Sequence, residues 1–528
     1  MAIELNIIDA TGSGCSSGSC ETDVAPAPLA PTTAKGRLAA QQLAAINPEG
    51  PIDWRFRRML SLTPAYPGRW FGGVRPPVGI SYVEEFVASR GVDTAGIDMN
   101  TTRRKKELFR KIEEFKPDVV GVTMMTYQYM STYDLIDELK ARYPHLKFVL
   151  GGPHVSALEA GVLDQCQSVD YAIAGEGEIP MLQLCQGAPP ESIAGLHYRD
   201  GESVKSGPPR ELVQDLDQFP YPRFKSYDLS KYTNEVEIST SRGCPHKCIF
   251  CSVPNIMGKQ IRYRSAKSVG DEMEHFYKLG IRSFQFGDDN FLANRHRIKE
   301  LMHEIESRNF EGAVLRCGQG IRADLINEQV LVAMKRAGFK QLGIGVESGS
   351  DRIMAIICKH LTVEQVDKAV GLACEQGFDV TLLFVYGTPG ETLEDVQKSI
   401  DLAKKHPVMK AFFFNLVPFP GTALSDWVNE NAALLGPFEH MFNREDEWKL
   451  RSQPFFETPE MPTADRHKAL KMTVRASQDI QVATLKRKLK RFGVLGDVAA
   501  QAARFNTLER LFVRNRTFRR LLDRVMFN

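Results

Sequence analysis

The chain has 528 residues, which at roughly 150 residues per domain corresponds to three or four domains. Apolar residues make up 43% and charged residues 25% of it, as is usual for a soluble globular protein, and the net charge of +2 singles out no class of partner. No uninterrupted apolar run reaches the roughly 18 residues of a membrane-spanning helix, which excludes an ordinary transmembrane protein.

Two features of the sequence predict a cytoplasmic protein. The first residues, Met1 to Leu5, lack the basic region and apolar core of a signal peptide. The ten cysteines are scattered, apart from a triplet at 244–251 and the pair Cys15 and Cys20, and so do not form a secreted disulfide framework. We therefore expect a reducing compartment.

Residues 1–55 are predicted to be a flexible tail, because they combine a Gly/Ser-rich run at 12–20 with an Ala/Pro-rich run at 25–33. Cys15 and Cys20 could bind a soft metal or a second cluster. Two thiols on a Gly/Ser segment without nearby histidines are more often incidental, so their role stays open.

Residues 56–190 alternate short apolar runs with amphipathic segments, which predicts a doubly wound parallel sheet. Its ligand would lie beyond the carboxyl ends of the strands. The predicted helices lie near 79–89, 103–115 and 133–143. The predicted strands are Met59–Thr63, Thr94–Asp98, Val119–Thr123, Phe148–Leu150 and Tyr171–Ala174.

Glycine follows several of these predicted strands, and it allows the backbone to approach a large flat ligand closely. His154, in Gly-Gly-Pro-His, could be a ligand or an ordinary loop residue that makes hydrogen bonds. The candidate contacts at this edge are Tyr127, Gly151, Gly152, His154, Gly175 and Glu176.

Residues 191–235 are rich in Pro, Gly and acidic residues, and we expect them to be a linker. Residues 236–425 contain a second βα series of six units, which predicts a partial TIM-type barrel with its site at the carboxyl ends of the strands. The predicted strands are Val236–Thr240, Ser283–Phe286, Val314–Cys317, Gln341–Val346, Val380–Tyr386 and Ala411–Val417.

The last part, residues 426–528, is predicted to be helical and basic. Residues 486–528 hold twelve Lys/Arg against three acids, with apolar residues at helical spacing. Such a tail could contact a membrane surface, nucleic acid or an acidic partner. A docked helix with a solvated basic face explains it more simply, and we expect no nucleic-acid partner.

Three cysteines, Cys244, Cys248 and Cys251, directly follow the first predicted barrel strand. Thiolates at this spacing can bind three irons of a cubic iron-sulfur cluster and leave the fourth iron open. A zinc site would need a fourth ligand, usually from a second Cys/His pair, and none follows at suitable spacing.

The triplet resembles that of the radical S-adenosylmethionine superfamily, and the preceding βα domain is similar to that of its cobalamin-binding branch. The resemblance covers roughly residues 58–425 and implies that the triplet holds a [4Fe-4S] cluster. By the same resemblance, Phe250 contacts adenine, Gly287, Asp288 and Asp289 hold the methionine amino group, Arg322 pairs with its carboxylate, and Glu347 and Ser348 contact the ribose.

The cofactors implied are the cluster, S-adenosylmethionine (SAM) and cobalamin, with flavodoxin or ferredoxin as reductant. Reductive cleavage of SAM would give a 5'-deoxyadenosyl radical, and the cofactors would carry the chemistry. The Asp-x-His-x-x-Gly motif that supplies a histidine to cobalt in many cobalamin proteins is absent from 58–184. Cobalamin is therefore expected to bind without such a histidine.

The resemblance favours methylation of an unactivated carbon, or of phosphorus, in a small or medium-sized metabolite. Two other radical reactions stay open, namely oxidative cyclisation or ring rearrangement, as on tetrapyrroles or nucleosides, and transfer of another SAM fragment. The non-enzyme alternative is a corrinoid sensor or a nucleic-acid-binding protein. The sequence does not identify the substrate.

Overall fold

The computed structural model describes residue 52 and residues 54–66, 74–102, 104–436 and 453–502. The predictions for Cys15, Cys20 and the end of the basic tail lie outside these residues. Among the helices within these ranges, none is long and apolar enough to cross a membrane.

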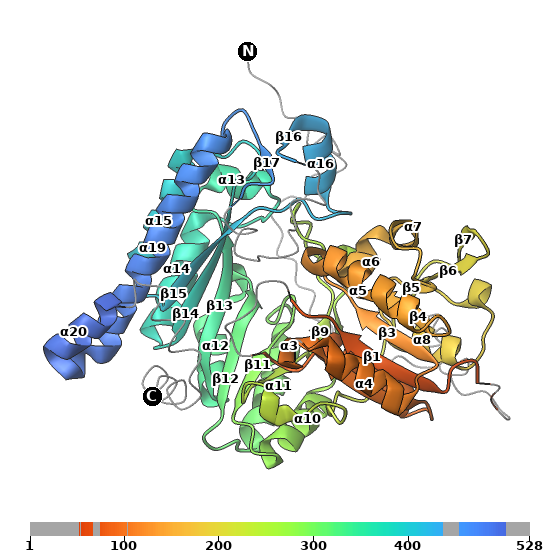
Figure 1. Ribbon diagram of the computed structural model, residues 1–528. Coiled ribbons are helices and arrows are strands. Elements are labelled where there is room, and N and C mark those ends of the chain that lie inside the picture. Colours follow the sequence, from red (N-terminus) through yellow and green to blue (C-terminus); the bar gives the residue numbers. More distant parts are fainter. Residues whose placement is uncertain (1–51, 53, 67–73, 103, 437–452, 503–528) are drawn as a thin grey trace.

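The first sheet has seven strands in the order β2-β1-β3-β4-β5-β6-β7, of which the first five are parallel (Figure 1). This confirms the doubly wound arrangement. The strands are β1 (Arg58–Thr63), β2 (Asp93–Asp98), β3 (Val119–Thr123), β4 (Lys147–Gly151), β5 (Tyr171–Ile173), β6 (Leu196–Asp200) and β7 (Ser203–Ser206). The helices are α2 (Val78–Ala88), α3 (Met99–Thr102), α4 (Lys105–Phe115), α5 (Tyr129–Arg142), α6 (Pro153–Leu158), α7 (Gly161–Gln165) and α8 (Glu178–Cys185).

Both faces of this sheet are covered, because successive residues of its strands point to opposite sides. Leu60 and Leu62 pack with residues of α4 and α5 in one buried cluster. Met59 packs with residues of α2 and α8 in another. Burial on both faces explains why the parallel strands are continuously apolar in sequence.

The predicted linker 191–235 begins instead with two more strands of this sheet. β6 pairs antiparallel with β5, and β7 pairs antiparallel with β6. Leu196 and Tyr198 are buried against the sheet. The hairpin is only a few residues long and lies among Pro and Gly residues, so the sequence shows no clear strand pattern there. The predicted domain boundaries therefore stay a prediction.

The second sheet contains six parallel strands in the order β15-β14-β13-β12-β11-β8. This confirms the partial barrel: β8 and β15 are edge strands and do not pair with each other. The strands are β8 (Val236–Ile238), β11 (Ser283–Phe286), β12 (Val314–Ile321), β13 (Phe339–Glu347), β14 (Asp379–Tyr386) and β15 (Lys410–Asn415). The helices are α9 (Val253–Ile256), α10 (Ala266–Lys278), α11 (Arg295–Ser307), α12 (Glu328–Arg336), α13 (Asp351–Ile356), α14 (Val363–Glu375) and α15 (Leu393–Lys405).

The two faces of this sheet differ in chemistry. One face packs on the outer helices, and there Phe384 of β14 stacks on Phe413 of β15 with ring centroids 4.7 Å apart. The opposite, inner face includes Phe412 and Phe414, which lie beside Leu383 and Val385 in the strand register and are about 42% and 43% exposed. Most of the apolar core thus lies outside the barrel.

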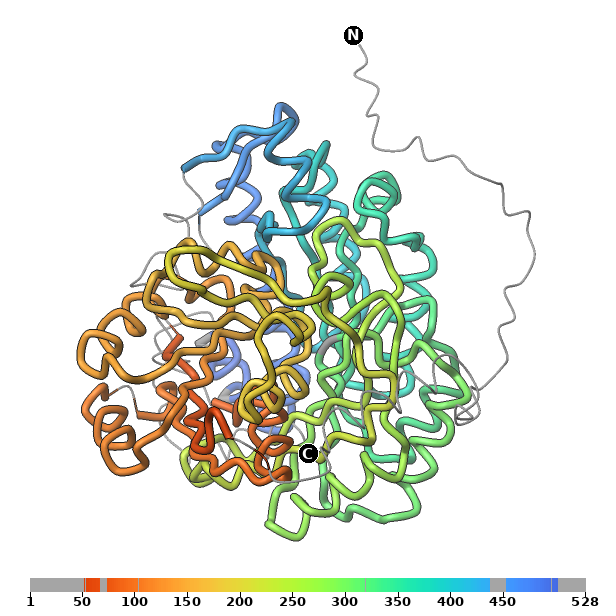
Figure 2. The backbone as a smooth tube through the Cα atoms, turned by 90° about the vertical axis from the view of Figure 1, so that its right-hand side faces the viewer, coloured from red at the N-terminus to blue at the C-terminus, as the bar shows by residue number. Residues whose placement is uncertain are grey.

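Where the structure describes the C-terminal region, it is mainly helical, as predicted. A long helix runs along the outside of the barrel beside α15 and β15 (Figure 1). The elements are α16 (Ala423–Asn431), the short hairpin of β16 (Ala433–Leu434) with β17 (Phe456–Glu457), the long helix α19 (Thr463–Leu489) and α20 (Gly493–Ala502). Figure 2 shows the first sheet and its helices, red to yellow, lying side by side with the barrel.

A buried carboxyl at the end of β14 predicts a pH-dependent stability. Burial raises the pKa of Glu391 to about 7, although the amide of Thr388 donates to its Oε2 at 3.0 Å. Because the folded protein holds this proton more tightly than the unfolded chain, the free energy of unfolding should fall by about 3 kcal/mol as the pH rises from about 4.5 to about 7. Glu391→Gln should flatten that decline in urea unfolding.

The matched control is Glu394→Gln, because the Glu394 side chain is 79% exposed. It should keep the wild-type pH profile of urea unfolding. A Glu391→Gln variant whose stability still declines over the same pH range would disprove the assignment.

Candidate functional site

The loop that carries the three cysteines is anchored at its start by Asp288. This carboxylate is buried, and its Oδ1 accepts hydrogen bonds from the Thr240 amide at 3.2 Å, the Thr240 hydroxyl at 2.8 Å and the Ser241 hydroxyl. The chain then forms the small hairpin of β9 (Ser241–Arg242) and β10 (Arg262–Tyr263). The cysteine loop is the connection between these two strands.

Gly243 makes the turn from β9 into this loop. Its φ of +98° lies in the left-handed region, and a Cβ atom there would stand 2.4 Å from the carbonyl oxygen of Gln260. Only glycine fits both conditions. The amide of the neighbouring Cys244 donates a hydrogen bond to the carbonyl oxygen of Gly258 at 3.2 Å, which joins the start and the end of the loop.

The three thiols are free, partly exposed and close enough to affect one another. Burial raises the pKa of each, that of Cys251 to about 11, and the neighbouring Cys248 and Cys244 raise the pKa of Cys251 further. Lys359 and Arg322 act in the opposite direction on Cys244 and Cys248. Bound iron would lower the pKa of the thiols further, since it binds the deprotonated thiolate.

The donor set consists of three thiols, the kind of ligand that iron-sulfur clusters use. Within the part of the chain that the structure describes, no three His, Cys, Asp or Glu side chains converge on one metal-ion position. Thiolates around a cubic cluster stand further apart, because iron and sulfide ions lie between them.

The structure separates the two neighbouring aspartates that were predicted to hold the methionine amino group. Asp288 is buried and its Oδ1 holds the cysteine loop, and it is not among the residues that line the cavity. Asp289 lines a cavity, its Oδ2 accepts from the Gly243 amide at 3.3 Å, and burial raises its pKa to about 6. It also raises the pKa of Cys244 and Cys251. Of the pair, Asp289 is the one beside the thiols.

Glu347, Lys359 and Arg322 form a charged group on the other side of the thiols. Glu347 ends β13 with a φ of +70°, and its Oε1 accepts from Lys359 Nζ at 2.8 Å. Arg322 donates to the Lys359 carbonyl at 3.1 Å and pairs with Asp324 at 3.1 Å. A left-handed non-glycine residue of this kind is typical of functional sites.

Lys359 was not predicted from the sequence. It lies in Cys358-Lys359-His360, whose outer two residues both have positive φ, and the preceding Ile357 carbonyl accepts from the Ile249 amide in the cysteine loop at 3.2 Å. A lone lysine after a short helix gives little signal. Only the packing of this segment on the cysteine loop brings its charge to the thiols.

The remaining predicted SAM contacts lie close to this group. Phe250 is partly buried against the apolar cluster of the first sheet, and Ser348 is fully buried and accepts from the Ser350 amide at 3.2 Å. Gly287 and Gly345 allow two carboxylates to lie against the backbone, because a Cβ there would stand 2.5 Å and 2.9 Å from the Oε1 atoms of Glu237 and Glu347. Two carboxylates, two cations and bare backbone suit a zwitterionic amino acid with a nucleoside attached.

A cavity of about 640 Å³ lies between the two sheets. It is lined from the carboxyl edge of the first sheet by Tyr127, Gly151, Gly152, Gly175 and Glu176, and from the barrel rim by Glu237, Ser239, Gly287 and Asp289. The Tyr127 ring lies 5.4 Å from that of Tyr66 and forms an aromatic wall. At Gly151 a Cβ would meet nothing nearer than 4.0 Å, so the backbone is open to the cavity. These features fit a large flat cofactor such as a corrinoid.

His154 is not among the residues that line this cavity, in contrast to the prediction. It is buried at the start of α6, where its ring stacks on Tyr129 with centroids 4.8 Å apart, and burial lowers its pKa to about 4. The helix that begins at Pro153 turns this side chain into the core.

Glu176 lines the cavity, but other protein groups engage its carboxylate. Oε1 pairs with Arg242 at 2.9 Å and Oε2 pairs with Arg262 at 2.8 Å, and both arginines come from the barrel side. The predicted cofactor contact is thus also a link between the two halves of the protein.

Comparison with known families agrees with this division. The model of the B12 binding domain matches residues 69–184, and that of the Radical SAM superfamily matches residues 238–403. The first covers the sheet whose carboxyl edge lines the cavity, and the second covers the barrel with the cysteine loop. Together they imply cobalamin, SAM and a [4Fe-4S] cluster as cofactors.

Several curated proteins are similar over most of their length. An uncharacterised methyltransferase of Pyrococcus horikoshii is 31% identical over 70% of this chain and 81% of its own. Cytidylyl-2-hydroxyethylphosphonate methyltransferase of Streptomyces wedmorensis is 26% identical over 60% of this chain and 68% of its own. Anaerobic magnesium-protoporphyrin IX monomethyl ester cyclase of Rubrivivax gelatinosus is 27% identical over 69% of this chain and 68% of its own.

Solved structures share most of the fold. The radical SAM methyltransferase TsrM of Kitasatospora setae, with cobalamin and a [4Fe-4S] cluster bound, has a TM-score of 0.65 at 19% identity and covers 80% of this chain and 89% of its own. The cobalamin-dependent radical enzyme OxsB, with aqua-cobalamin and SAM bound, has a TM-score of 0.65 at 15% identity. The match covers 89% of this chain and 75% of the OxsB chain. With these matches, the chain belongs to the cobalamin-binding branch of the radical SAM superfamily.

Proposed function

We propose that this enzyme is a cobalamin-dependent radical SAM methyltransferase that adds a methyl group to an unactivated carbon, or to phosphorus, of a small-molecule metabolite. The observation that carries the proposal is the single cavity reached from both halves of the protein. Gly151 and Gly175 line it from the cobalamin-binding side, and Gly287 and Asp289, beside the cysteine loop, line it from the barrel side.

In this proposal each charged side chain near the thiols has one task. Cys244, Cys248 and Cys251 bind the cluster. Asp289 accepts from the methionine amino group, and Arg322 and Lys359 face its carboxylate. Glu347, held in place by Lys359, accepts from the ribose hydroxyls, while Phe250 packs on the adenine.

The chain binds and orients its cofactors, and it excludes water. Bound SAM and the cluster supply a 5'-deoxyadenosyl radical, and cobalamin supplies the methyl group. Tyr127, Gly151, Gly152 and Gly175 are proposed to contact cobalamin, and the buried Asp288 keeps the cysteine loop in register with the barrel. A cavity between two packed halves shields a radical from solvent and from stray hydrogen donors.

The test uses the reconstituted holoenzyme and SAM with a deuterated methyl group, incubated with a metabolite extract of the producing cells. High-resolution mass spectrometry should find one product that carries the intact CD₃ group. We expect one 5'-deoxyadenosine and one S-adenosylhomocysteine, hence two SAM molecules, for each methylated product. Equal product formation by a preparation free of corrinoid would contradict the proposal.

Similarity to the magnesium-protoporphyrin cyclase favours oxidative cyclisation as the second candidate function. The same experiment separates the two reactions, because the methyl label stays out of a cyclised product. A product that loses hydrogen and gains no deuterium would replace methylation by cyclisation.

The remaining partners are also proposals. A reduced flavodoxin or ferredoxin would supply the electron, and the reducing cytoplasm would protect the cluster. Contact of the basic segment 486–528 with an anionic membrane surface is supported by its composition.

A further inference from the structure

A buried group of four charges joins the two halves of the protein at one side of the cavity. Glu176 and Glu178 follow β5 of the first sheet, whereas Arg242 and Arg262 belong to the β9–β10 hairpin that closes the cysteine loop. Arg242 pairs with Glu176 at 2.9 Å and with Glu178 at 2.6 Å, and Arg262 pairs with Glu176 at 2.8 Å.

Every member of this group is almost withdrawn from solvent. The side chains of Glu176, Glu178 and Arg262 are 2–4% exposed, and that of Arg242 is 12% exposed. Although burial opposes ionisation, Arg242 and Arg262 hold the pKa of Glu176 below its ordinary value. The group is therefore charged and tightly paired.

Further contacts fix the orientation of both arginines. Arg262 donates to the Val213 carbonyl at 2.7 Å and to the Met257 carbonyl at 2.8 Å. The guanidinium of Arg242 lies over the rings of Tyr82 and Phe219, at 5.1 Å and 5.4 Å from their centroids. The guanidinium groups of both arginines are planar and are held on several sides, so they allow little rotation of one half of the protein against the other.

Stability alone does not explain such a group, because well-packed apolar residues of similar volume often stabilise a fold equally well. The use of buried ion pairs that is best supported is to select one arrangement among several. A second inter-domain contact at the same cavity is different: Arg75 pairs with Glu235 and Glu237, but its side chain is 40% exposed. The buried group is thus the rigid side of the interface.

The position of Arg242 gives this rigidity a consequence for the site. It stands two residues before Cys244, and the intervening Gly243 amide donates to Asp289. Glu176 in turn follows Gly175 at the cavity edge. We propose that Glu176 and Glu178 are positioning residues, which fix the cobalamin cavity relative to the cysteine loop through Arg242 and Arg262.

The test measures geometry and needs no substrate. In full-length enzyme carrying cluster and cobalamin, cob(II)alamin and the reduced cluster are both paramagnetic, so relaxation-enhancement EPR reports the distance between them. Glu176→Gln and Glu178→Gln keep the side-chain shape and remove one charge each. Both should broaden or shift the distance distribution, with iron and cobalamin content unchanged. The Gly243 and Cys244 amides should exchange with deuterium at least about tenfold faster.

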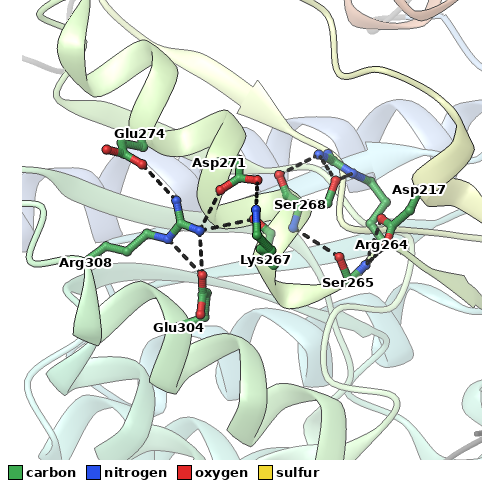
Figure 3. A network of polar contacts seen from close by, with 9 residues as sticks. All are labelled: Asp217, Arg264, Ser265, Lys267, Ser268, Asp271, Glu274, Glu304 and Arg308. Atoms are coloured by element: carbon green, nitrogen blue, oxygen red, sulfur yellow. Dashed lines mark hydrogen bonds and ion pairs between the residues drawn. The ribbon is translucent and has the colours of Figure 1, made fainter.

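The matched control is Arg308→Gln on the barrel exterior. Arg308 pairs with Asp271, Glu274 and Glu304 of α10 and α11, so this network also joins one arginine to several carboxylates, but it is more exposed and links no two domains (Figure 3). Its loss should lower stability without changing the distance distribution or the amide exchange of the cysteine loop.

An unchanged distance distribution and unchanged exchange in both glutamate variants, with full cofactor content, would overturn the proposal. If Glu176→Gln fails to fold, Glu178→Gln decides alone, because it leaves the pair of Glu176 with Arg262 intact. The inference rests on family membership and not on methyl transfer. A different reaction product would therefore not contradict the positioning role of Glu176 and Glu178.

Discussion

Replacement of Cys248 by serine is expected to leave the protein without a stable [4Fe-4S] cluster. Formation of 5'-deoxyadenosine should fall on the order of a thousandfold or more, the scale seen when a group essential to the chemistry is lost. The reason is that three thiolates are the minimum that leaves one iron open for SAM while holding the other three. Iron and sulfide analysis, together with EPR of the reduced protein, checks the result.

Cys358→Ser is the matched control for this prediction. Cys358 is a free, partly exposed thiol whose backbone carbonyl lies 3.9 Å from Cys248 Sγ, yet it lies outside the triplet. The variant should keep its iron and its SAM cleavage. Loss of the cluster in Cys358→Ser, or its retention in Cys248→Ser, would mean that the ligand set is assigned wrongly.

Replacement of Gly151 by leucine is expected to exclude cobalamin while leaving the cluster intact. Gly151 ends β4 at the cavity, and its φ does not lie in the left-handed region, so a side chain there enters open space without straining the backbone. Affinity for cobalamin should fall at least about a hundredfold, equal to about 2.8 kcal/mol. Absorbance titration with hydroxocobalamin measures it, and SAM cleavage should continue without methylated product.

Gly161→Leu provides the comparison. At Gly161 in α7 a Cβ would also meet nothing nearer than 4.0 Å, but the residue does not line the cavity. The variant should bind cobalamin like the wild type. If both leucine variants bind it normally, the cofactor lies elsewhere.

The arrangement of the barrel and its cysteine loop was predictable from sequence because its signals are local. Most barrel strands are short, largely apolar runs that alternate with helices, and Cys244, Cys248 and Cys251 stand together after the first strand. The five parallel strands of the first sheet were predictable for the same reason. Their burial on both faces makes each a continuous apolar segment.

The errors concern residues whose surroundings are set by distant parts of the chain. Asp288 and Asp289 are adjacent and chemically identical, but one is buried under Thr240 and the other faces the cavity. His154 was taken for a cavity residue because it follows a strand, although α6 turns it into the core. Lys359 was missed because its partner Glu347 and the thiols come from other elements. Pairings of this kind leave no pattern in sequence.

In the described part of the chain, the edges of β8 and β15 that face away from the sheet determine which surface the barrel presents to bound molecules. A closed eight-stranded barrel fills its interior with its own side chains, whereas a six-stranded sheet that stops short of closure keeps its concave surface available. Phe412 and Phe414 on that surface remain substantially exposed, beside Leu383 and Val385 in the strand register. Among the described residues, the incomplete barrel thus keeps part of its own apolar inner surface accessible.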